Sequence, residues 1–211
     1  MEQKKTILRK PAPRLVAIVG GSGAGKTYLA SKLKKEFGKD AVVMSLDDFY
    51  HDLSHRPMEH RSKTNFDDPK AIDWVCLEKT LKQLLNRKPA RVPCYDFSMH
   101  CRRGEHTVLQ PKAIIIVDGL WLLRRPSMRK LFDLKIFLEC TTVLRFERRM
   151  QRDVAERGRT RESVCEQFIE MVAPMHKKFV QPQARYADVI LPGTFGDEDV
   201  KDLARKIAVG Q

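Results

Sequence analysis

The sequence has few cysteines and no long apolar stretch, and each shortage excludes a class of protein. Its five cysteines are scattered through 211 residues, and no two of them form a C-x-x-C pair. An odd, dispersed set favours reduced thiols over a disulfide framework or a zinc site. The longest apolar runs, such as residues 113–117, are far too short to cross a bilayer. We therefore expect no membrane-spanning segment and no membrane partner.

Acidic residues are also scarce, because 27 of them face 40 lysines and arginines and leave a formal charge of +13. Such a charge favours acidic partners without choosing among nucleic acid, membrane surface and phosphorylated small molecules. Seven arginines fall between Arg145 and Arg161 against three acids, and aromatic residues are sparse there. This pattern resembles a local phosphate clamp more than a track for nucleic acid, so no nucleic-acid partner is expected.

The chain shows no internal repeat and no low-complexity linker, and its length suits one hydrophobic core. We predict a basic, flexible N-terminal tail over residues 1–13 and a single domain over residues 14–211. The apolar stretch behind the basic tail runs straight into a glycine-rich loop, which leaves no place for a signal-peptide cleavage site. A cytoplasmic protein is expected.

The strongest motif lies in residues 14–30, where an apolar run breaks into GGSGAGKT and a helical pattern follows. The spacing fits G-x-x-x-x-G-K-[ST], which wraps backbone N–H groups around a polyphosphate and adds a lysine and a metal-binding hydroxyl. A chain of average composition matches the four fixed positions by chance roughly once in 100 times. We therefore predict a nucleoside triphosphate site rather than a plain glycine turn. Its residues are Gly20, Gly21, Ser22, Gly23, Ala24, Gly25, Lys26 and Thr27.

Buried strands alternate with helices along the rest of the chain, which predicts an α/β fold of the P-loop NTPase type with a parallel sheet between helices. Further strands are predicted at residues 41–46, 113–119, 134–140 and 187–191, and a closing helix at residues 197–208. Residues 90–97 also read as a strand, but Pro93 favours an edge position outside the main sheet. We expect a small appended β-hairpin over about 90–110, with its turn at Gly104.

Acids follow two of these strands, where ligands bind in open α/β sheets. Asp47 and Asp48 end the strand at 41–46, and Asp118 ends the strand at 113–119 in the position that holds Mg²⁺ beside a phosphate loop. The alternatives are solvated loop acids and an Asp-Gly turn. Asp68, followed by Pro69, has the pattern of a helix N-cap, which leaves Asp67 as the better candidate for a ligand contact.

The polar segment 51–66 contains His51, His55 and His60, for which a mobile lid or a plain loop is favoured over a metal site. Tyr95, Phe97 and His100 would project from the predicted hairpin, where packing and surface roles are the alternatives to a ligand contact.

An arginine-rich helix follows the strand at 134–140, with Thr141 or Thr142 as its N-cap. Its i, i+3, i+4 and i+7 spacing is predicted to place four guanidiniums on one face. Three more arginines bracket Gly158, as a hinged lid over about 145–165 that closes on a transferred phosphate would require. A solvated basic face is the alternative. The seven are Arg145, Arg148, Arg149, Arg152, Arg157, Arg159 and Arg161.

The phosphate loop, the acid that would hold the metal, the candidate base and the arginine-rich lid together predict phosphoryl transfer.

From residue 14 to 192 the chain resembles the uridine-cytidine kinases, within the group that includes phosphoribulokinase and bacterial pantothenate kinase. The shared motifs are GGSGAGKT, SLDDFY, NFDDP, PCYDFSMH, VDGL, RRMQRDVAERGR and YADVILP. The phosphate loop alone is unspecific, whereas PxYDFxxH joined to RDxxERGR is much more so. The resemblance implies ATP-dependent phosphorylation of the 5′-hydroxyl of uridine or cytidine, with Mg²⁺, by a homotetramer.

The resemblance also implies roles for individual residues. Asp47 would take the proton from the 5′-hydroxyl, and Asp67 would bind the ribose hydroxyls with help from Arg149. The pyrimidine pocket would comprise Tyr50, Phe66, Tyr95, Phe97, His100, Arg159 and Gln167. Lys26, Arg152 and Arg157 would meet the phosphates of ATP, and the metal would lie near Thr27, Asp118 and Asp47.

The chain departs from the family in two places. It has Asp48 where the family usually has Ser after the catalytic acid, and Asp118 where the metal acid is usually Glu. Two alternatives therefore stay open. A kinase of the same group would act on another small hydroxyl compound, such as ribulose 5-phosphate or pantothenate, and a nucleic-acid-binding ATPase would use the positive charge.

Overall fold

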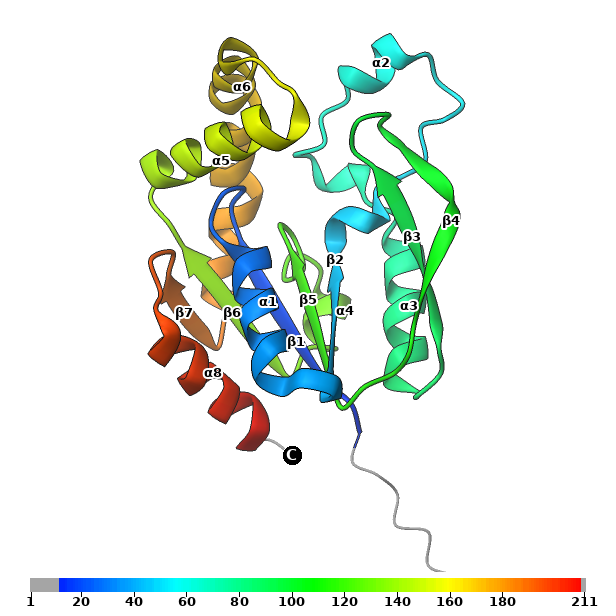
Figure 1. Ribbon diagram of the computed structural model, residues 1–211, viewed down its shortest axis with the longest axis vertical. Helices are drawn as coiled ribbons and strands as arrows, with labels where there is room; N and C mark the ends of the chain where they lie inside the picture. The colour runs from blue at the N-terminus through cyan, green and yellow to red at the C-terminus, as the bar shows by residue number, and fades with distance from the viewer. Residues whose placement is uncertain (1–11, 210–211) are drawn as a thin grey trace, which may run out of the picture.

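The computed structural model describes residues 12–209, which form a five-stranded parallel sheet between helices and a separate two-stranded hairpin (Figure 1). The strand order in the sheet is β2-β5-β1-β6-β7, so the predicted α/β fold is confirmed. The predicted N-terminal tail lies almost entirely outside the described residues. The sheet strands are β1 (Arg14–Gly20), β2 (Ala41–Ser45), β5 (Ile114–Gly119), β6 (Leu134–Glu139) and β7 (Val189–Pro192).

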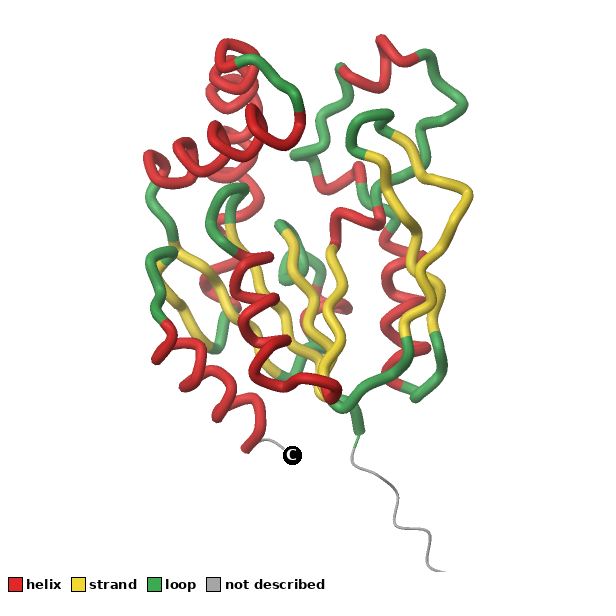
Figure 2. Tube along the Cα trace, in the orientation of Figure 1, coloured by secondary structure: helices red, strands yellow, loops and turns green. Residues whose placement is uncertain are grey.

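Helices cover both faces of this sheet (Figure 2). Their bounds are α1 (Lys26–Phe37), α2 (Met58–Ser62), α3 (Trp74–Leu85), α4 (Pro126–Arg129), α5 (Thr142–Arg157), α6 (Arg161–Gln167), α7 (Ala173–Met175) and α8 (Asp197–Val209). None of the helices described within residues 12–209 combines the length and the apolar character that a membrane crossing requires.

The central strand β1 shows why the sheet needs cover on both sides. Its side chains alternate, so Leu15 and Val19 pack in the layer that contains α3, while Val16 and Ile18 pack against α1 and α8. All four are fully buried. A strand buried on both faces is apolar at every position, which explains the continuous run in the sequence.

The parallel register brings the functional strand ends together. β1 lies between β5 and β6, and β5 pairs with β2 so that Ser45 is opposite Asp118. The phosphate loop, Asp47 and Asp118 therefore leave the same edge of the sheet. β2 ends at Ser45, one residue earlier than predicted, and Asp47 lies in the short 3-10 helix η2 (Leu46–Phe49).

The hairpin consists of β3 (Ala90–Asp96) and β4 (Cys101–Leu109), which form a sheet of their own. The predicted separation from the main sheet at Pro93 is confirmed. The predicted turn at Gly104 is wrong, because Gly104 lies inside β4 and the turn comprises residues 97–100. The side chain of Asp96 makes this turn, accepting hydrogen bonds from the backbone N–H groups of Ser98 and Met99 at 2.9 and 3.1 Å.

Helix ends follow the predicted caps with one correction. Thr141 accepts a hydrogen bond from the backbone N–H of Leu144, and Gly158 ends α5 in the left-handed region at φ 61°. Asp68 caps only the short 3-10 helix η3 (Pro69–Ala71). The long helix α3 begins at Trp74 with Asp73 as its cap, because Ile72 returns to an extended conformation.

The helical segment after the lid is continuous but irregular. Two π-helical segments, η4 (Phe168–Val172) and η5 (His176–Val180), flank α7. Pro174 lies between them, and its missing N–H favours such a widening of the hydrogen-bond pattern. The segment 51–66, predicted to be irregular, contains the short helix α2.

Candidate functional site

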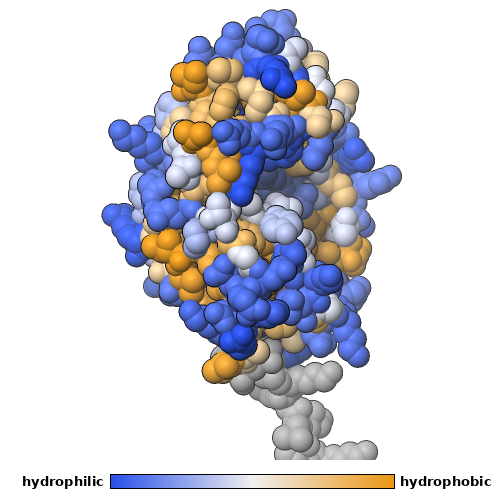
Figure 3. Space-filling view, turned by 60° about the vertical axis from the view of Figure 1, so that its left-hand side comes forward, coloured by the Kyte–Doolittle hydropathy of each residue, from blue (hydrophilic) through white to orange (hydrophobic). Residues whose placement is uncertain are grey.

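A cleft of about 510 Å³ opens at the carboxyl edge of the sheet. The space-filling view shows a hollow bordered mainly by hydrophilic residues in the upper half of the molecule (Figure 3). The residues that line the cleft are Ser22, Lys26, Thr27, Asp47, Tyr50, Phe66, Asp67, Tyr95, Phe97, Ser98, His100, Asp118, Leu120, Arg149, Arg152, Arg157, Arg159, Ser163 and Gln167. The cleft thus brings together every side chain that the sequence nominated for the nucleoside pocket and the metal site, with four of the seven lid arginines.

The phosphate loop enters the cleft between β1 and α1. Gly23 and Gly25 have φ of 79° and 96°, a conformation that glycine adopts without strain. The Nζ of Lys26 donates a 2.9 Å hydrogen bond to the carbonyl of Gly21. Burial lowers the pKa of Lys26, although Asp118 and Asp47 oppose the shift. Together with the N-terminus of α1, the loop forms a site suited to a polyphosphate.

Asp118 and Asp47 lie on the cleft wall beside this loop, linked through Ser45. The Ser45 hydroxyl donates to Oδ1 of Asp118 over 3.4 Å and accepts from the backbone N–H of Asp47 over 3.3 Å. Burial raises the pKa of Asp118 to about 6, with Lys26 opposing the shift. Its Oδ2 is buried without a hydrogen-bond partner.

The unpaired Oδ2 of Asp118 lies in the same cleft as the hydroxyl of Thr27 and the carboxylate of Asp47. Such a set of oxygen atoms suits a hard cation such as Mg²⁺. Among residues 12–209, no group of three His, Cys, Asp or Glu side chains is close enough to hold a metal by itself. A cation at this position therefore needs further oxygen ligands, which the phosphate groups of a nucleotide can supply.

Asp48 does not line the cleft. It faces a separate cavity of about 270 Å³ between β2 and the hairpin, whose wall includes Val92 and Leu109. Burial, followed by repulsion from Asp47, raises its pKa to about 6. Its carboxylate is therefore a neighbour of the site rather than a member of it.

Aromatic rings form the far end of the cleft. Phe66 stacks on the His100 ring with centroids 5.0 Å apart, and its carbonyl accepts a 3.0 Å hydrogen bond from the Tyr50 hydroxyl. The Tyr95 hydroxyl is buried without a partner. Burial, then Arg159 and Arg157, lowers the pKa of His100 and keeps its ring neutral at neutral pH. These groups offer a flat apolar slot with free polar atoms at its edge.

Asp67 is the buried acid of this end, with 9% of its surface exposed. Burial raises its pKa, and the guanidinium of Arg149 opposes the shift. The side chain of the neighbouring Asp68 caps η3 by accepting a hydrogen bond from the backbone N–H of Lys70. The structure thus separates the two acids as the sequence predicted.

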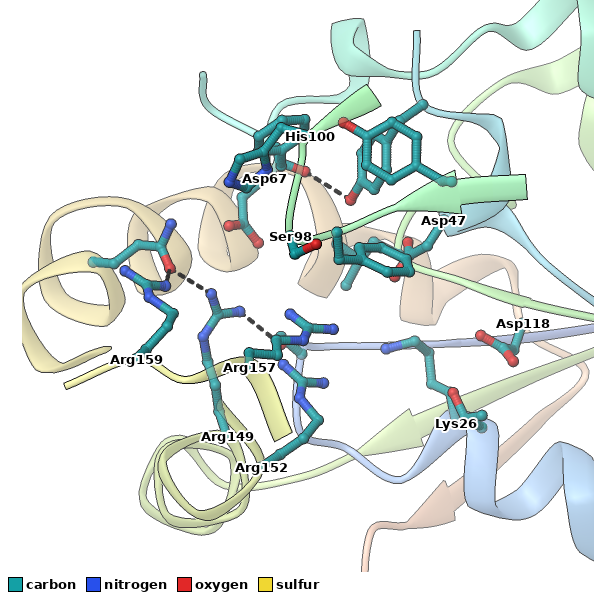
Figure 4. Close-up of a pocket in the computed structure, with 18 of the residues that line it drawn as sticks. Lys26, Asp47, Asp67, Ser98, His100, Asp118, Arg149, Arg152, Arg157 and Arg159 are labelled. Atoms are coloured by element: carbon teal, nitrogen blue, oxygen red, sulfur yellow. Dashed lines mark hydrogen bonds between the residues drawn. The ribbon is translucent and has the colours of Figure 1, made fainter. Parts of the chain in front are cut away.

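Four arginines enter the cleft from the lid (Figure 4). Arg149 donates to the hydroxyl of Ser22 over 2.8 Å and to Oε1 of Gln167 over 2.7 Å. Arg159 also donates to Gln167, and to the hydroxyl of Ser163 over 2.7 Å. These bonds join the phosphate loop, α5 and α6. The four are Arg149, Arg152, Arg157 and Arg159.

The prediction that Arg145 and Arg148 share this face is wrong. Arg145 is 1% exposed and lies behind the phosphate loop, while Arg148 donates a 2.9 Å hydrogen bond to the carbonyl of Gly193. Gly21 and Gly23 of the loop approach α5 so closely that Arg145 is covered. Arg161 also does not line the cleft.

Sequence reasoning missed three lining residues, Ser98, Leu120 and Ser163, and one supporting acid, Asp153. Asp153 is four residues from both Arg149 and Arg157, a spacing that puts opposite charges in contact on a helix. The role of Asp153 could therefore have been predicted from this spacing in the sequence. The lining residues carry no such signal, because Ser and Leu are common in loops and helices alike.

Comparison with known proteins places this geometry in a family. Residues 15–200 match the Phosphoribulokinase / Uridine kinase family. A uridine kinase of Clostridium perfringens is 43% identical over 181 residues, covering 85% of this chain and 87% of that protein. A uridine kinase of Bacillus anthracis is 42% identical over 198 residues, covering 93% of each. The phosphoribulokinase of Rhodobacter spheroides has a similar fold, with a TM-score of 0.62 and 16% identity over 86% of this chain and 70% of that one. The chain belongs to the phosphoribulokinase and uridine kinase family.

Proposed function

We propose that this protein transfers the terminal phosphoryl group of ATP to the 5′-hydroxyl of uridine or cytidine. One observation carries the proposal: a single cleft joins a phosphate loop to an aromatic slot, with Asp47 on the shared wall. The relatives named uridine kinase, at 42–43% identity over most of the chain, support this acceptor. The product is UMP or CMP.

The donor end binds ATP through the loop from Gly20 to Thr27, and Lys26 turns its ammonium from the Gly21 carbonyl to the phosphates. Arg152 and Arg157 face the same end of the cleft and neutralise the transferred group. Thr27, Asp118 and Asp47 would hold Mg²⁺. When bound, the cation neutralises charge on the donor phosphates.

The acceptor end orients the nucleoside. Asp67 and Arg149 bind the ribose hydroxyls, Phe66 and Phe97 pack on the base, and Tyr95 and His100 read its edge. Both edge groups are available, because the Tyr95 hydroxyl has no partner and the His100 ring is neutral. Tyr50, Arg159 and Gln167 complete the pocket, in which a purine or a bare sugar would leave polar groups unpaired.

The chemical step does not require a strong base. In phosphoryl transfer the bond to the leaving oxygen is largely broken before the new bond forms, so Asp47 has to orient the hydroxyl and accept its proton late. Closure of the arginine lid brings positive charge to the transferred group and excludes water.

An acceptor panel tests the proposal. Purified protein is given ATP and Mg²⁺ with uridine, cytidine, adenosine, ribulose 5-phosphate or pantothenate, and ADP formation is followed. Turnover of uridine and cytidine alone is expected. Turnover of ribulose 5-phosphate or pantothenate without uridine would contradict it, as would hydrolysis stimulated by RNA in place of any small acceptor.

Three further properties belong to the same proposal. A cytoplasmic location and an absence of nucleic-acid partners suit an enzyme of small metabolites. A homotetramer is expected from the family resemblance, and sedimentation equilibrium of the purified protein tests it.

A further inference from the structure

Arg145 is a buried cation that forms no ion pair with an acid among residues 12–209. Its residue is 1% exposed, and its Nε and Nη1 have no hydrogen-bond partner. Its Nη2 donates one long bond, of 3.4 Å, to the hydroxyl of Thr142. The ring of Phe168 lies below it, 5.8 Å from the guanidinium carbon. Burial lowers the pKa of Arg145, and no carboxylate contributes to the shift. A buried charge left in this state costs folding free energy.

This cation is packed against the back of the phosphate loop. A Cβ added to Gly21 would lie 2.8 Å from Cδ and from Nη1 of Arg145, and a Cβ on Gly23 would lie 2.3 Å from the Arg145 carbonyl oxygen. The Arg145 side chain therefore requires a glycine at position 21, and the backbone of α5 requires one at position 23. The side chain does not line the cleft, so the loop backbone separates it from the phosphate site.

His176 packs against Gly21 at the same point as Arg145. Its Nδ1 would also lie 2.8 Å from a Cβ at that position, and it is buried without a partner. Its Nε2 lies 3.1 Å from Oε1 of Gln181, a pairing in which Nε2 carries the proton and Nδ1 is left as an acceptor. Burial, then the charge of Arg145, lowers the pKa of His176 to about 4, so the ring is neutral at pH 7.

Arg145 and Lys26 both lie near His176. The carboxylates of Asp118 and Asp47 act on Lys26, whereas the Cys140 thiol, and no carboxylate of residues 12–209, acts on Arg145. A nucleoside triphosphate brings negative charge to the loop against which Arg145 packs. The penalty of burying Arg145 is then largest in the empty protein and is offset when the phosphates bind.

We propose that Arg145, packed with His176 against Gly21, is a positioning residue of the phosphate loop whose buried charge is compensated by the phosphates of the nucleotide. The inference deepens the proposed function on its donor side and is independent of the acceptor. It assigns Arg145 to the donor site although its side chain is outside the cleft.

The test separates charge from packing with two substitutions. Arg145→Met keeps the unbranched apolar stem of the side chain without its charge, and Arg145→Lys keeps the charge. For Arg145→Met we expect a Tm without nucleotide equal to or above that of the unchanged protein. Its Kd for Mg-ATP and for tripolyphosphate, measured by calorimetry, should rise ~10-fold or more. Arg145→Lys should recover most of that affinity.

The control is Arg205→Met on α8. Arg205 is an exposed arginine paired with Asp202, and its substitution should leave both Kd values unchanged.

Unchanged Kd values in Arg145→Met would overturn the proposal, and so would an equal loss of affinity in Arg145→Lys and Arg145→Met. A second measurement uses the unchanged protein and covers the case in which Arg145→Met does not fold. The ¹H–¹⁵N signal of the Arg145 Nε should shift on titration with tripolyphosphate, and a constant signal would contradict the inference. Neither readout needs an acceptor, so a negative acceptor panel leaves this test intact.

Discussion

The Nε of Arg152 donates a 2.9 Å hydrogen bond to Oδ1 of Asp153, the next residue along α5, whose side chain has no exposed surface. The same carboxylate lies 3.5 Å from Nη1 of Arg157 and 3.3 Å from Nε of Arg149. The last contact is an ion pair without the angle of a hydrogen bond. One buried acid therefore holds three arginines of the cleft.

Asp153→Asn should destabilise the protein, because it leaves these arginines without their shared counter-charge. Removing one partner of a buried ion pair typically costs ~3–5 kcal/mol of unfolding free energy. Urea unfolding measures the loss, and saturating Mg-ATP should restore part of it by supplying negative charge. The control is Glu147→Gln, an exposed acid on the same helix. Equal stability of the two variants would show that Asp153 is not the counter-charge.

Asp47→Asn should abolish turnover while ATP binding stays nearly intact. The amide keeps the size of the side chain but cannot accept the proton of the hydroxyl, and loss of such a group lowers kcat by ~10²–10⁴-fold. Steady-state kinetics give kcat, and calorimetry gives the Kd for Mg-ATP. A loss of ATP affinity as large as the loss of rate would instead make Asp47 primarily a metal ligand.

His100→Ala should raise the KM for uridine with a smaller effect on kcat. The substitution removes both an edge contact to the base and the ring that stacks on Phe66. We expect a change of ~10-fold, the scale of one lost contact in a pocket. Met99→Ala, at the exposed neighbouring position, is the matched control. Should KM stay constant in His100→Ala, the residue does not belong to the acceptor pocket.

Asp48→Asn should make the protein more stable at pH 7.5 but not at pH 4. The folded pKa of Asp48 is raised to about 6, above its ordinary value. An acid with a raised pKa destabilises the fold when ionised, and this cost disappears as pH falls through the folded pKa toward the unfolded one. We expect a gain of ~1–2 kcal/mol at pH 7.5, allowing for partial solvent screening. Thermal unfolding at pH 7.5, 6 and 4 checks it, and a difference independent of pH would contradict it.

Several elements were predictable because their signals are local. A phosphate loop is one continuous segment, and the strands buried on both faces read as unbroken apolar runs. Gly158 and Thr141 mark the ends of α5 in the sequence for the same reason. The turn at Gly104 was predicted wrongly because a glycine is also tolerated in an exposed strand, and the side chain of Asp96 made the turn elsewhere.

Local sequence patterns suffice to predict the α/β fold, the phosphate loop and the candidate residues, because backbone propensity and hydrophobic periodicity act over a few residues. Which arginines face the cleft depends instead on how distant segments of the chain pack together. Helical spacing puts Arg145 and Arg149 one turn apart, but the close approach of Gly21 and Gly23 to α5 covers the first of them. Tertiary packing also separates Asp47, which lies in the cleft, from Asp48, which faces the cavity between β2 and the hairpin.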